Sequence, residues 1–213
     1  MLKTIIQGPY VQYFDEAHTK IEEKGCFLDD NRTGPWILYW DNGNIESKGD
    51  YTGEETHTDW GVRTGPWIFY HENGNMSEEG YFEDGKRTGQ WISYWDNGKI
   101  MRKGDYENGN RTGPWINYWK NGNIRSSGSY KYGKEMGAWI FYWDSEEAGQ
   151  IQMKGDYRDG LETGRWIHYV NGRKYKEGDY KDGRKTGQWV YYDRDEEVEK
   201  IEDCVNGECT KID

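Results

Sequence analysis

Long hydrophobic runs are missing from this sequence of 213 residues, in which 33% of the residues are hydrophobic. No stretch approaches the roughly 20 apolar residues of a membrane-spanning helix. The apolar start at residues 1–6 is too short for the core of a secretory signal peptide, so we expect a cytoplasmic protein. The low hydrophobic content also argues against a compact globule with one large core.

Positive charge is scarce as well, since 39 acidic residues against 28 basic ones give a net charge of −11. The excess acid lies in residues 52–62, 144–150 and 193–213, and the rest of the chain is close to neutral. The sequence shows neither the basic footprint of a nucleic-acid-binding protein nor the polybasic patch that attracts proteins to anionic lipid. We therefore predict no nucleic-acid partner and disfavour a membrane.

Cysteine is limited to Cys26, Cys204 and Cys209. The segment Cys204-Val-Asn-Gly-Glu-Cys209 has the signature of a hairpin, which would place its two thiols opposite each other, near enough for a disulfide in oxidising surroundings. The alternative is a pair of reduced thiols in the cytosol. Two sulfurs with no third cysteine or nearby histidine make a poor metal site, so we expect no metal and no cofactor.

Catalytic motifs are absent too, including Gly-x-Ser-x-Gly, a phosphate loop and His-Glu-x-x-His. The four histidines (His18, His57, His71 and His168) lie in four different sequence contexts. His57 with Glu54, Glu55 and Asp59 could hold a metal, but a hydrated turn is the simpler interpretation. We predict no catalytic residues and no enzymatic activity.

Aromatic residues are plentiful, at 16% of the chain. Seven tryptophans recur with spacings of 31, 24, 24, 24, 27 and 23 residues: Trp36, Trp67, Trp91, Trp115, Trp139, Trp166 and Trp189. A recurrence of about two dozen residues indicates a stacked-repeat protein. We call these seven residues the anchor tryptophans. Tyr10 occupies the same slot in a degenerate first unit.

Each repeat predicts a β-hairpin. Trp36, Leu38 and Trp40 alternate with Ile37 and Tyr39, which is the period of a strand. The Asn-Gly that follows predicts a two-residue turn with two positive φ angles. Such a turn would pair Trp40 with Ile45, Leu38 with Ser47 and Trp36 with Gly49.

In this register the glycine leaves room for the indole that faces it. The same role is predicted for five further glycines, Gly80, Gly104, Gly128, Gly155 and Gly178. Thr-Gly upstream of each anchor is interpreted as the bend between hairpins. The proline before some anchors is interpreted as the first residue of a strand.

The expected fold is all-β, an elongated single sheet of tandem antiparallel hairpins. About eight units fill residues 1–192, with a degenerate unit at 1–27, an insertion at 52–62 and an enlarged hairpin loop at 144–150. The hairpin after Trp166 is one residue shorter, which predicts a bulge at Tyr175. Residues 193–213 are interpreted as an acidic C-terminal cap, or alternatively as a binding arm.

Candidate binding residues come from two series. A tyrosine recurs on the face predicted to lie opposite the anchors, where it would either stiffen the sheet or bind a partner. The slot two residues after each anchor varies and could carry specificity. The candidate partner-binding residues are Tyr39, Tyr70, Tyr94, Tyr118, Tyr142, Tyr169, Phe69, Phe141 and His168.

The units TGPWINYWKNGNIRSSGSY and TGQWISYWDNGKIMRKGDY resemble the variant MORN repeat common in bacteria. The resemblance extends over residues 32–192 and implies a twisted array of antiparallel hairpins. Some bacterial relatives are antitoxins or immunity-like partners of toxins, and others are lipid-binding or scaffolding modules. The leading hypothesis is a non-catalytic protein-binding module, with a toxin as the partner that the resemblance implies. The alternatives are a solenoid that binds cell-wall glycans and a membrane or scaffold attachment module.

Overall fold

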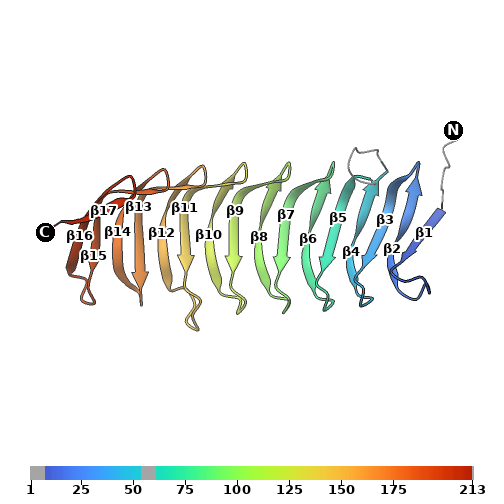
Figure 1. Cartoon of the computed structure of the whole chain (residues 1–213), viewed down its shortest axis with the longest axis horizontal. Helices are drawn as coiled ribbons and strands as arrows, with labels where there is room; N and C mark the ends of the chain where they lie inside the picture. Colours follow the sequence, from blue (N-terminus) through green and yellow to red (C-terminus); the bar gives the residue numbers. More distant parts are fainter. Residues whose placement is uncertain (1–7, 54–60, 213) are drawn as a thin grey trace. The chain divides into compact units, whose positions relative to one another are not determined.

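The computed structural model describes residues 8–53 and 61–212. These residues form one antiparallel sheet of 17 strands built from consecutive hairpins, which confirms the predicted all-β, single-sheet fold (Figure 1). By its internal contacts the chain divides into two units, residues 1–110 and 111–213. The described part contains no helix that could span a membrane. The predictions for residues 1–7 and 54–60, within the degenerate unit and the insertion, lie outside the described residues.

The first unit contains eight complete strands, each antiparallel to the next. They are β1 (Gly8–Tyr13), β2 (Ile21–Leu28), β3 (Asn31–Tyr39), β4 (Ile45–Thr52), β5 (Arg63–Tyr70), β6 (Met76–Glu83), β7 (Lys86–Tyr94) and β8 (Ile100–Glu107). Tyr10 of β1 lies opposite Gly25 of β2, as Trp36 lies opposite Gly49 in the next hairpin. The degenerate unit therefore keeps the register of the regular ones.

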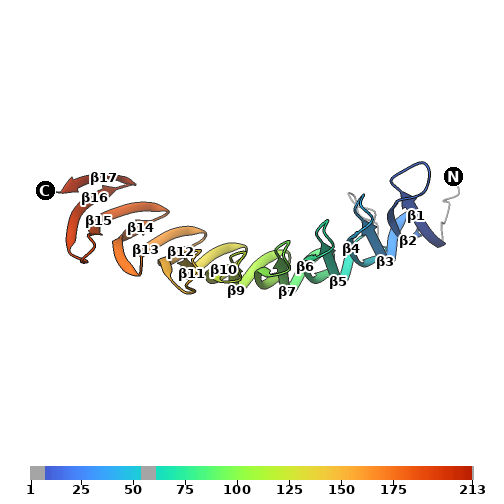
Figure 2. The ribbon, with the colours of Figure 1, turned by 90° about the horizontal axis from the view of Figure 1, so that it is seen from below.

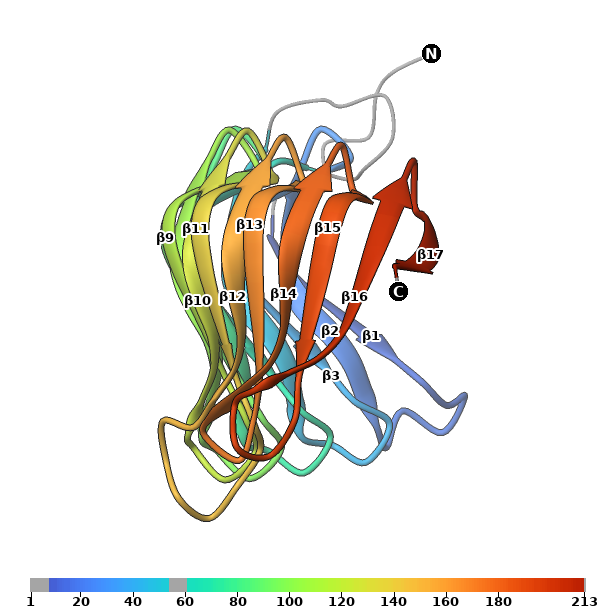
Figure 3. The ribbon, with the colours of Figure 1, turned by 90° about the vertical axis from the view of Figure 1, so that its left-hand side faces the viewer.

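The second unit continues the pattern. Its strands are β9 (Asn110–Tyr118), β10 (Ile124–Lys131), β11 (Lys134–Tyr142), β12 (Ile151–Arg158), β13 (Leu161–Val170), β14 (Arg173–Lys181), β15 (Arg184–Tyr192), β16 (Val198–Val205) and β17 (Glu208–Ile212). The enlarged loop between β11 and β12 extends beyond the neighbouring turns (Figure 1). The acidic segment 193–213 contains β16 and β17, which add to the sheet beside β15 (Figure 3).

The predicted register is correct for two of its three pairs but wrong at the turn. Trp36 lies opposite Gly49 and Leu38 opposite Ser47, whereas Ile45 lies opposite Tyr39 and not Trp40. Trp40 is the residue before a three-residue loop: its N–H donates to Asn44 O at 2.8 Å, and Gly43 N–H donates back to Trp40 O at 2.8 Å. Among the loop residues only Gly43 has a positive φ, 87°. This is the three-residue hairpin with glycine in the left-handed region.

The predicted two-residue turn occurs instead at the opposite ends of the strands. There Asp84 and Gly85 both have positive φ, 48° and 73°, and Asn206-Gly207 follows the same pattern. In the shortened hairpin after Trp166, Asn171-Gly172 also has two positive φ angles. The predicted bulge at Tyr175 is present, because Lys174 and Lys176 pair with Tyr169 and His168 and leave Tyr175 without an opposite residue, but Glu46 is left unpaired in the same way in a regular hairpin, so the shorter loop is not its cause.

The bend at Thr-Gly lies inside the strands that carry an anchor tryptophan and not between hairpins, which corrects the prediction. In β5, Gly65 has φ 66°, and the β4–β5 register shifts between Lys48 and Asp50. Three residues, 65–67, therefore face the single Gly49. Pro66 sits within this bulge and not at the first strand position, because a bulge tolerates a residue without an N–H donor. Figures 2 and 3 show β13–β16 bowed along their length.

Candidate functional site

The anchor tryptophans lie on one face of the sheet, which we call the tryptophan face. Their exposed fractions are only 0–3%. Six of the seven anchors are seen over the glycine of the preceding hairpin: a Cβ on Gly49 would come within 2.3 Å of Trp67, and one on Gly80 within 2.2 Å of Trp91, and the same holds for Trp36, Trp139, Trp166 and Trp189. The prediction placed the indole of the same hairpin over this glycine, and that detail is wrong.

The correction has a physical reason in the bulge. Residues 65–67 oppose Gly49, so the bulge brings Trp67 back across the glycine. The indole N–H of Trp67 then donates to Asp50 O at 3.2 Å, and that of Trp166 donates to Asp156 O at 3.2 Å. Gly25, under Trp36, belongs to the same set of glycines. Each indole consequently joins two successive hairpins.

Further side chains cover these indoles. The ring of Tyr51 lies edge-on between Trp36 and Trp67, at centroid distances of 6.2 and 5.1 Å. A guanidinium stacks over most anchors in the first unit, as Arg87 does over Trp91 at 4.1 Å. Because the anchors are buried beneath these side chains, they cannot serve as stacking platforms for a sugar.

A third row on the tryptophan face changes from hairpin to hairpin. Its members lie directly opposite one another on successive strands, and we call them the variable row. In the first unit it consists of Glu23, Leu38, Ser47, Phe69, Glu78, Ser93 and Arg102. In the second it consists of Asn117, Ser126, Phe141, Met153, His168, Lys176, Tyr191 and Lys200.

The opposite side, which we call the tyrosine face, repeats an isoleucine or valine and a tyrosine on each anchor-bearing strand. Its tyrosines lie beside charged groups: Lys24 Nζ is 5.3 Å from the Tyr39 ring, and the Tyr94 hydroxyl donates to Glu79 at 2.5 Å. Burial, and then this hydrogen bond, raise the pKa of Tyr94 to about 12. These contacts favour the interpretation that the tyrosines cover and stiffen the sheet.

The nine predicted binding residues therefore do not form one surface. Tyr39, Tyr70, Tyr94, Tyr118, Tyr142 and Tyr169 belong to the tyrosine face, because each follows a variable-row residue on its strand. Phe69, Phe141 and His168 are members of the variable row on the other side. Phe69 and Phe141 stack on Trp67 and Trp139, with interplanar angles of 26° and 24°.

The turn edge carries a hydrogen-bond ladder that sequence reasoning missed. Asn42 and Asn44 both donate from Nδ2 to Glu72 O at 2.7 Å, and Trp40 Nε1 donates to Tyr70 O at 3.2 Å. His71 takes the place of the tryptophan and lies 3.0 Å from Tyr94 O through Nε2. The recurring Trp-x-Asn-Gly-Asn could have revealed this ladder from the sequence. Its asparagines form hydrogen bonds within their own turn and also to the backbone of the next turn.

His168 is a titratable group of the variable row whose pKa is strongly lowered. Its Nε2 is buried and makes no hydrogen bond to any described residue. Burial, and then the charges of Lys176 and Lys185, lower its pKa to about 4. The imidazole is neutral near neutral pH, so His168 contributes a half-buried ring and no charge.

A pH dependence follows for His168. The unfolded state binds the proton near pH 6.5 and the folded state only near pH 4, so the free energy of unfolding should fall as the pH drops through this window. The variant His168→Asn, which uses the residue found at Asn117 in the equivalent slot, should show a shallower decline. Urea titrations of both proteins between these pH values measure the difference. Parallel curves would contradict the prediction.

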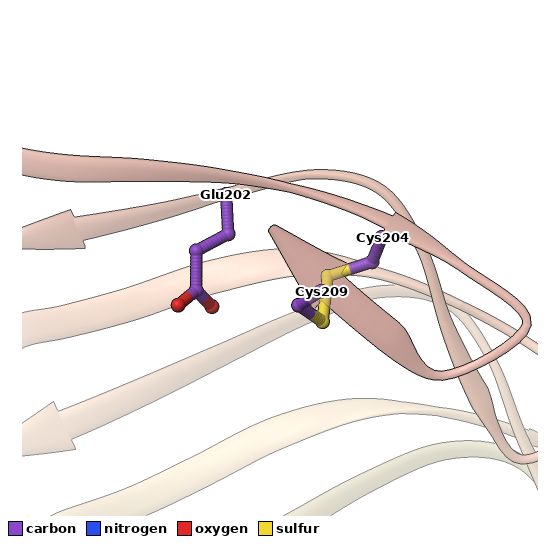
Figure 4. A group of neighbouring side chains, drawn as sticks. All are labelled: Glu202, Cys204 and Cys209. Atoms are coloured by element: carbon purple, nitrogen blue, oxygen red, sulfur yellow. A yellow bond between two sulfur atoms is a disulfide. The ribbon is translucent and has the colours of Figure 1, made fainter. Parts of the chain in front are cut away.

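Cys204 and Cys209 lie opposite each other on β16 and β17 and form a disulfide. Glu202 lies on the same side of β16 (Figure 4). Its carboxylate and the two sulfurs are within 4.8 Å of one another, but both sulfurs are held in the disulfide and cannot ligate a metal. Glu202 instead accepts hydrogen bonds from the Tyr191 hydroxyl at 2.7 Å and from Lys200 at 2.6 Å.

Reduction should loosen only the end of the sheet. Closing so short a loop stabilises by about 2 kcal/mol in the chain-entropy description, so reductant or Cys209→Ser should speed amide exchange in β16 and β17 by about 30-fold. Exchange in β9–β12 should stay unchanged and serves as the internal control. Faster exchange throughout the second unit would show that the disulfide holds more than its own hairpin.

Comparison with known proteins gives a family for the regular part of the chain. The model of the MORN repeat variant matches four segments, residues 32–52, 63–84, 87–108 and 111–132. A search of curated proteins found no match to the chain. MORN repeats are generally non-catalytic binding repeats, and the matched segments have the indole, glycine and turn geometry described above. Residues 32–132 of this chain are therefore four MORN repeats of the variant type.

Proposed function

We propose that this repeat array binds a protein partner through the variable row of the tryptophan face. The observation that supports this is the contrast between the two faces. On its anchor-bearing strands the tyrosine face repeats an isoleucine or valine and a tyrosine, and only the residue paired with that isoleucine changes, as at Lys48, Glu79 and Ser127, so its aromatic positions offer little to distinguish one hairpin from the next. The variable row sets apolar, acidic, basic and neutral side chains on an otherwise constant platform, which is an arrangement suited to recognition of one particular surface.

The row offers two phenylalanines for such an interface. Phe69 and Phe141 are half-buried against their tryptophans and keep part of each ring exposed. Flat, partly exposed aromatic rings held rigidly by neighbours are favoured as interface anchors, because little side-chain entropy is lost on binding. A toxin would be one such partner, with this chain as its immunity-like inhibitor. The product of the neighbouring gene is the first protein to test.

The experiment compares the two faces directly. A partner captured from the native host would be identified and purified, and its affinity measured by calorimetry for wild type, for Phe69→Ser/Phe141→Ser and for Tyr70→Ser/Tyr142→Ser. Serine already occupies the variable row at Ser93, so the first variant is compatible with the repeat. We expect it to weaken binding by about tenfold or more, a loss of at least about 1.4 kcal/mol, and the tyrosine-face variant to bind nearly as wild type.

Two results would overturn the proposal. One is the absence of any protein that binds the purified chain at micromolar concentration. The other is the reverse pattern, in which the tyrosine-face variant loses the partner and the variable-row variant retains it. Thermal unfolding of both variants shows whether a loss of binding reflects a loss of structure.

A further inference from the structure

The last part of the variable row gathers positive charge on a chain whose net charge is −11. His168, Lys176, Tyr191 and Lys200 lie directly opposite one another on β13, β14, β15 and β16. With neighbouring strands about 4.8 Å apart, the backbones at Lys176 and Lys200 are about 10 Å apart. The lysines are 24 residues apart in the chain, which is why inspection for basic runs missed them.

Lys185 also belongs to this group. It occupies the position four residues before its anchor, Trp189, where Arg87 stacks over Trp91 in the first unit. Lys185 Nζ lies 4.3 Å from the Trp189 ring and 5.9 Å from the Tyr191 ring. Lys176 Nζ lies 5.9 Å from the Trp189 ring, and Lys200 Nζ lies 4.7 Å from the Tyr191 ring. Three ammonium groups thus surround two aromatic rings. We call Lys176, Lys185 and Lys200 the lysine cluster.

The lysine cluster is short of negative charge. Lys200 pairs with Glu202 at 2.6 Å, whereas Lys176 and Lys185 form no ion pair with any residue that the structure describes. Burial lowers the pKa of Lys185, and the charges of Lys176 and Lys200 lower it further against the opposing effect of Glu202. His168 is neutral and supplies no counter-charge. An added anion would therefore relieve repulsion among these side chains.

In the first unit the equivalent positions carry charges of both signs, which neutralise each other. There the row carries Glu23 and Glu78, which form ion pairs with the stacked Arg32 and Arg87. Arg102 also lies 3.6 Å from Glu78. Near Trp189 the variable row carries Lys176 in place of a glutamate, while the side chain stacked over the anchor, Lys185, is still basic. The excess charge therefore results from a change in the row and is not a property of the repeat itself.

We propose that the lysine cluster is the docking site for an acidic segment of the protein partner, an inference that rests on the proposed function. Carboxylates of that segment pair with the three ammonium groups, which the rings of Trp189 and Tyr191 hold in place. The same row continues through Met153 and Phe141, so a partner along it meets basic and apolar positions in turn. That alternation fits a protein surface better than a layer of lipid headgroups.

The test uses repeat-compatible substitutions. Serine occupies the slot of Lys176 at Ser126, and glutamate occupies the slot of Lys185 at Glu162, so Lys176→Ser/Lys185→Glu keeps residues that this fold already accepts. The matched control is Lys154→Ser/Lys131→Glu, which makes the same charge change outside the cluster. The probe is a synthetic hexaglutamate peptide, titrated at low and at physiological salt while tryptophan fluorescence or heat is recorded.

We expect hexaglutamate to bind the wild-type chain, and to bind the cluster variant about tenfold more weakly and the control within about twofold of wild type. Raising the salt should weaken the wild-type interaction. The proposal fails if wild type does not bind the peptide, if both variants lose affinity equally, or if phosphatidylserine vesicles or inorganic phosphate bind the cluster more tightly. A captured partner that binds the cluster variant as well as wild type would remove the docking site and leave the proposed function standing.

Discussion

Replacing Gly49 by alanine should lower the free energy of unfolding by about 3 kcal/mol or more. The new Cβ would lie 2.3 Å from Cδ2 and 2.4 Å from Cε2 of Trp67. The indole has little freedom to withdraw, because its N–H donates to Asp50 O at 3.2 Å and Tyr51 and Phe69 pack against it with centroids at 5.1 and 5.7 Å. Denaturant titration gives the loss, and amide exchange should locate it in β4 and β5.

Two companion variants separate the steric effect from the conformational one. Gly43→Ala puts a Cβ where no atom lies within 4 Å but φ is +87°, so it should cost only about 1 kcal/mol. Gly49→Ala combined with Trp67→Ala should be no less stable than Trp67→Ala alone, since the clash disappears with the ring. If Gly49→Ala costs no more than Gly43→Ala, the indole does not lie over this glycine.

Truncation of Trp139 to alanine should cost about 3–5 kcal/mol, the range for a fully buried large ring. The side chain is 3% exposed, covers Gly128 and donates to Ser129 O at 3.3 Å. Its loss would leave that carbonyl without its donor and remove the edge contacts of Tyr130 and Tyr157, whose centroids lie 5.3 and 6.0 Å away. Because each hairpin depends on its neighbours, exchange should quicken first in β10–β12.

Trp143 in the same hairpin is the matched control. It is 39% exposed and also donates one hydrogen bond, to Tyr169 O at 3.3 Å. Trp143→Ala should therefore cost only about 1–2 kcal/mol, from one hydrogen bond and partial burial. Equal losses for the two variants would mean that burial over glycine is not what distinguishes the anchors.

The repeat period and the pairing of Trp36 with Gly49 could be predicted from sequence because both follow from the alternation of the strand. Pairing alone could not identify the indole over each glycine, because the indole that covers Gly49 belongs to Trp67 and not to Trp36, the residue that pairs with it. A signal was present in the spacing. Gly80, Gly128 and Gly155 each precede the covering tryptophan by 11 residues, whereas the in-hairpin separation varies between 12 and 16.

The candidate site was harder to predict for a related reason. Alternation placed Tyr39 and Phe69 on their strands correctly, but nothing local to either residue says which face a partner would use. The lysine cluster is assembled from three strands, so it has no contiguous sequence signature. Cytoplasmic location also stays a prediction; alkylation of Cys204 and Cys209 in freshly lysed cells would report whether the thiols are oxidised where the protein resides.

In the last hairpin Trp189 lies opposite Glu202, at the position where the earlier regular hairpins have glycine. The side chain of Glu202 takes up the space that a following indole would need, and its carboxylate is held by Tyr191 and Lys200. The next strand, β17, accordingly brings no indole to this position and pairs with β16 through Cys209 opposite Cys204. One carboxylate thus ends the succession of indoles over glycines, and the outermost described strand at this end is short and joined to its neighbour by a covalent bond, which makes it a poor template for a strand of another molecule.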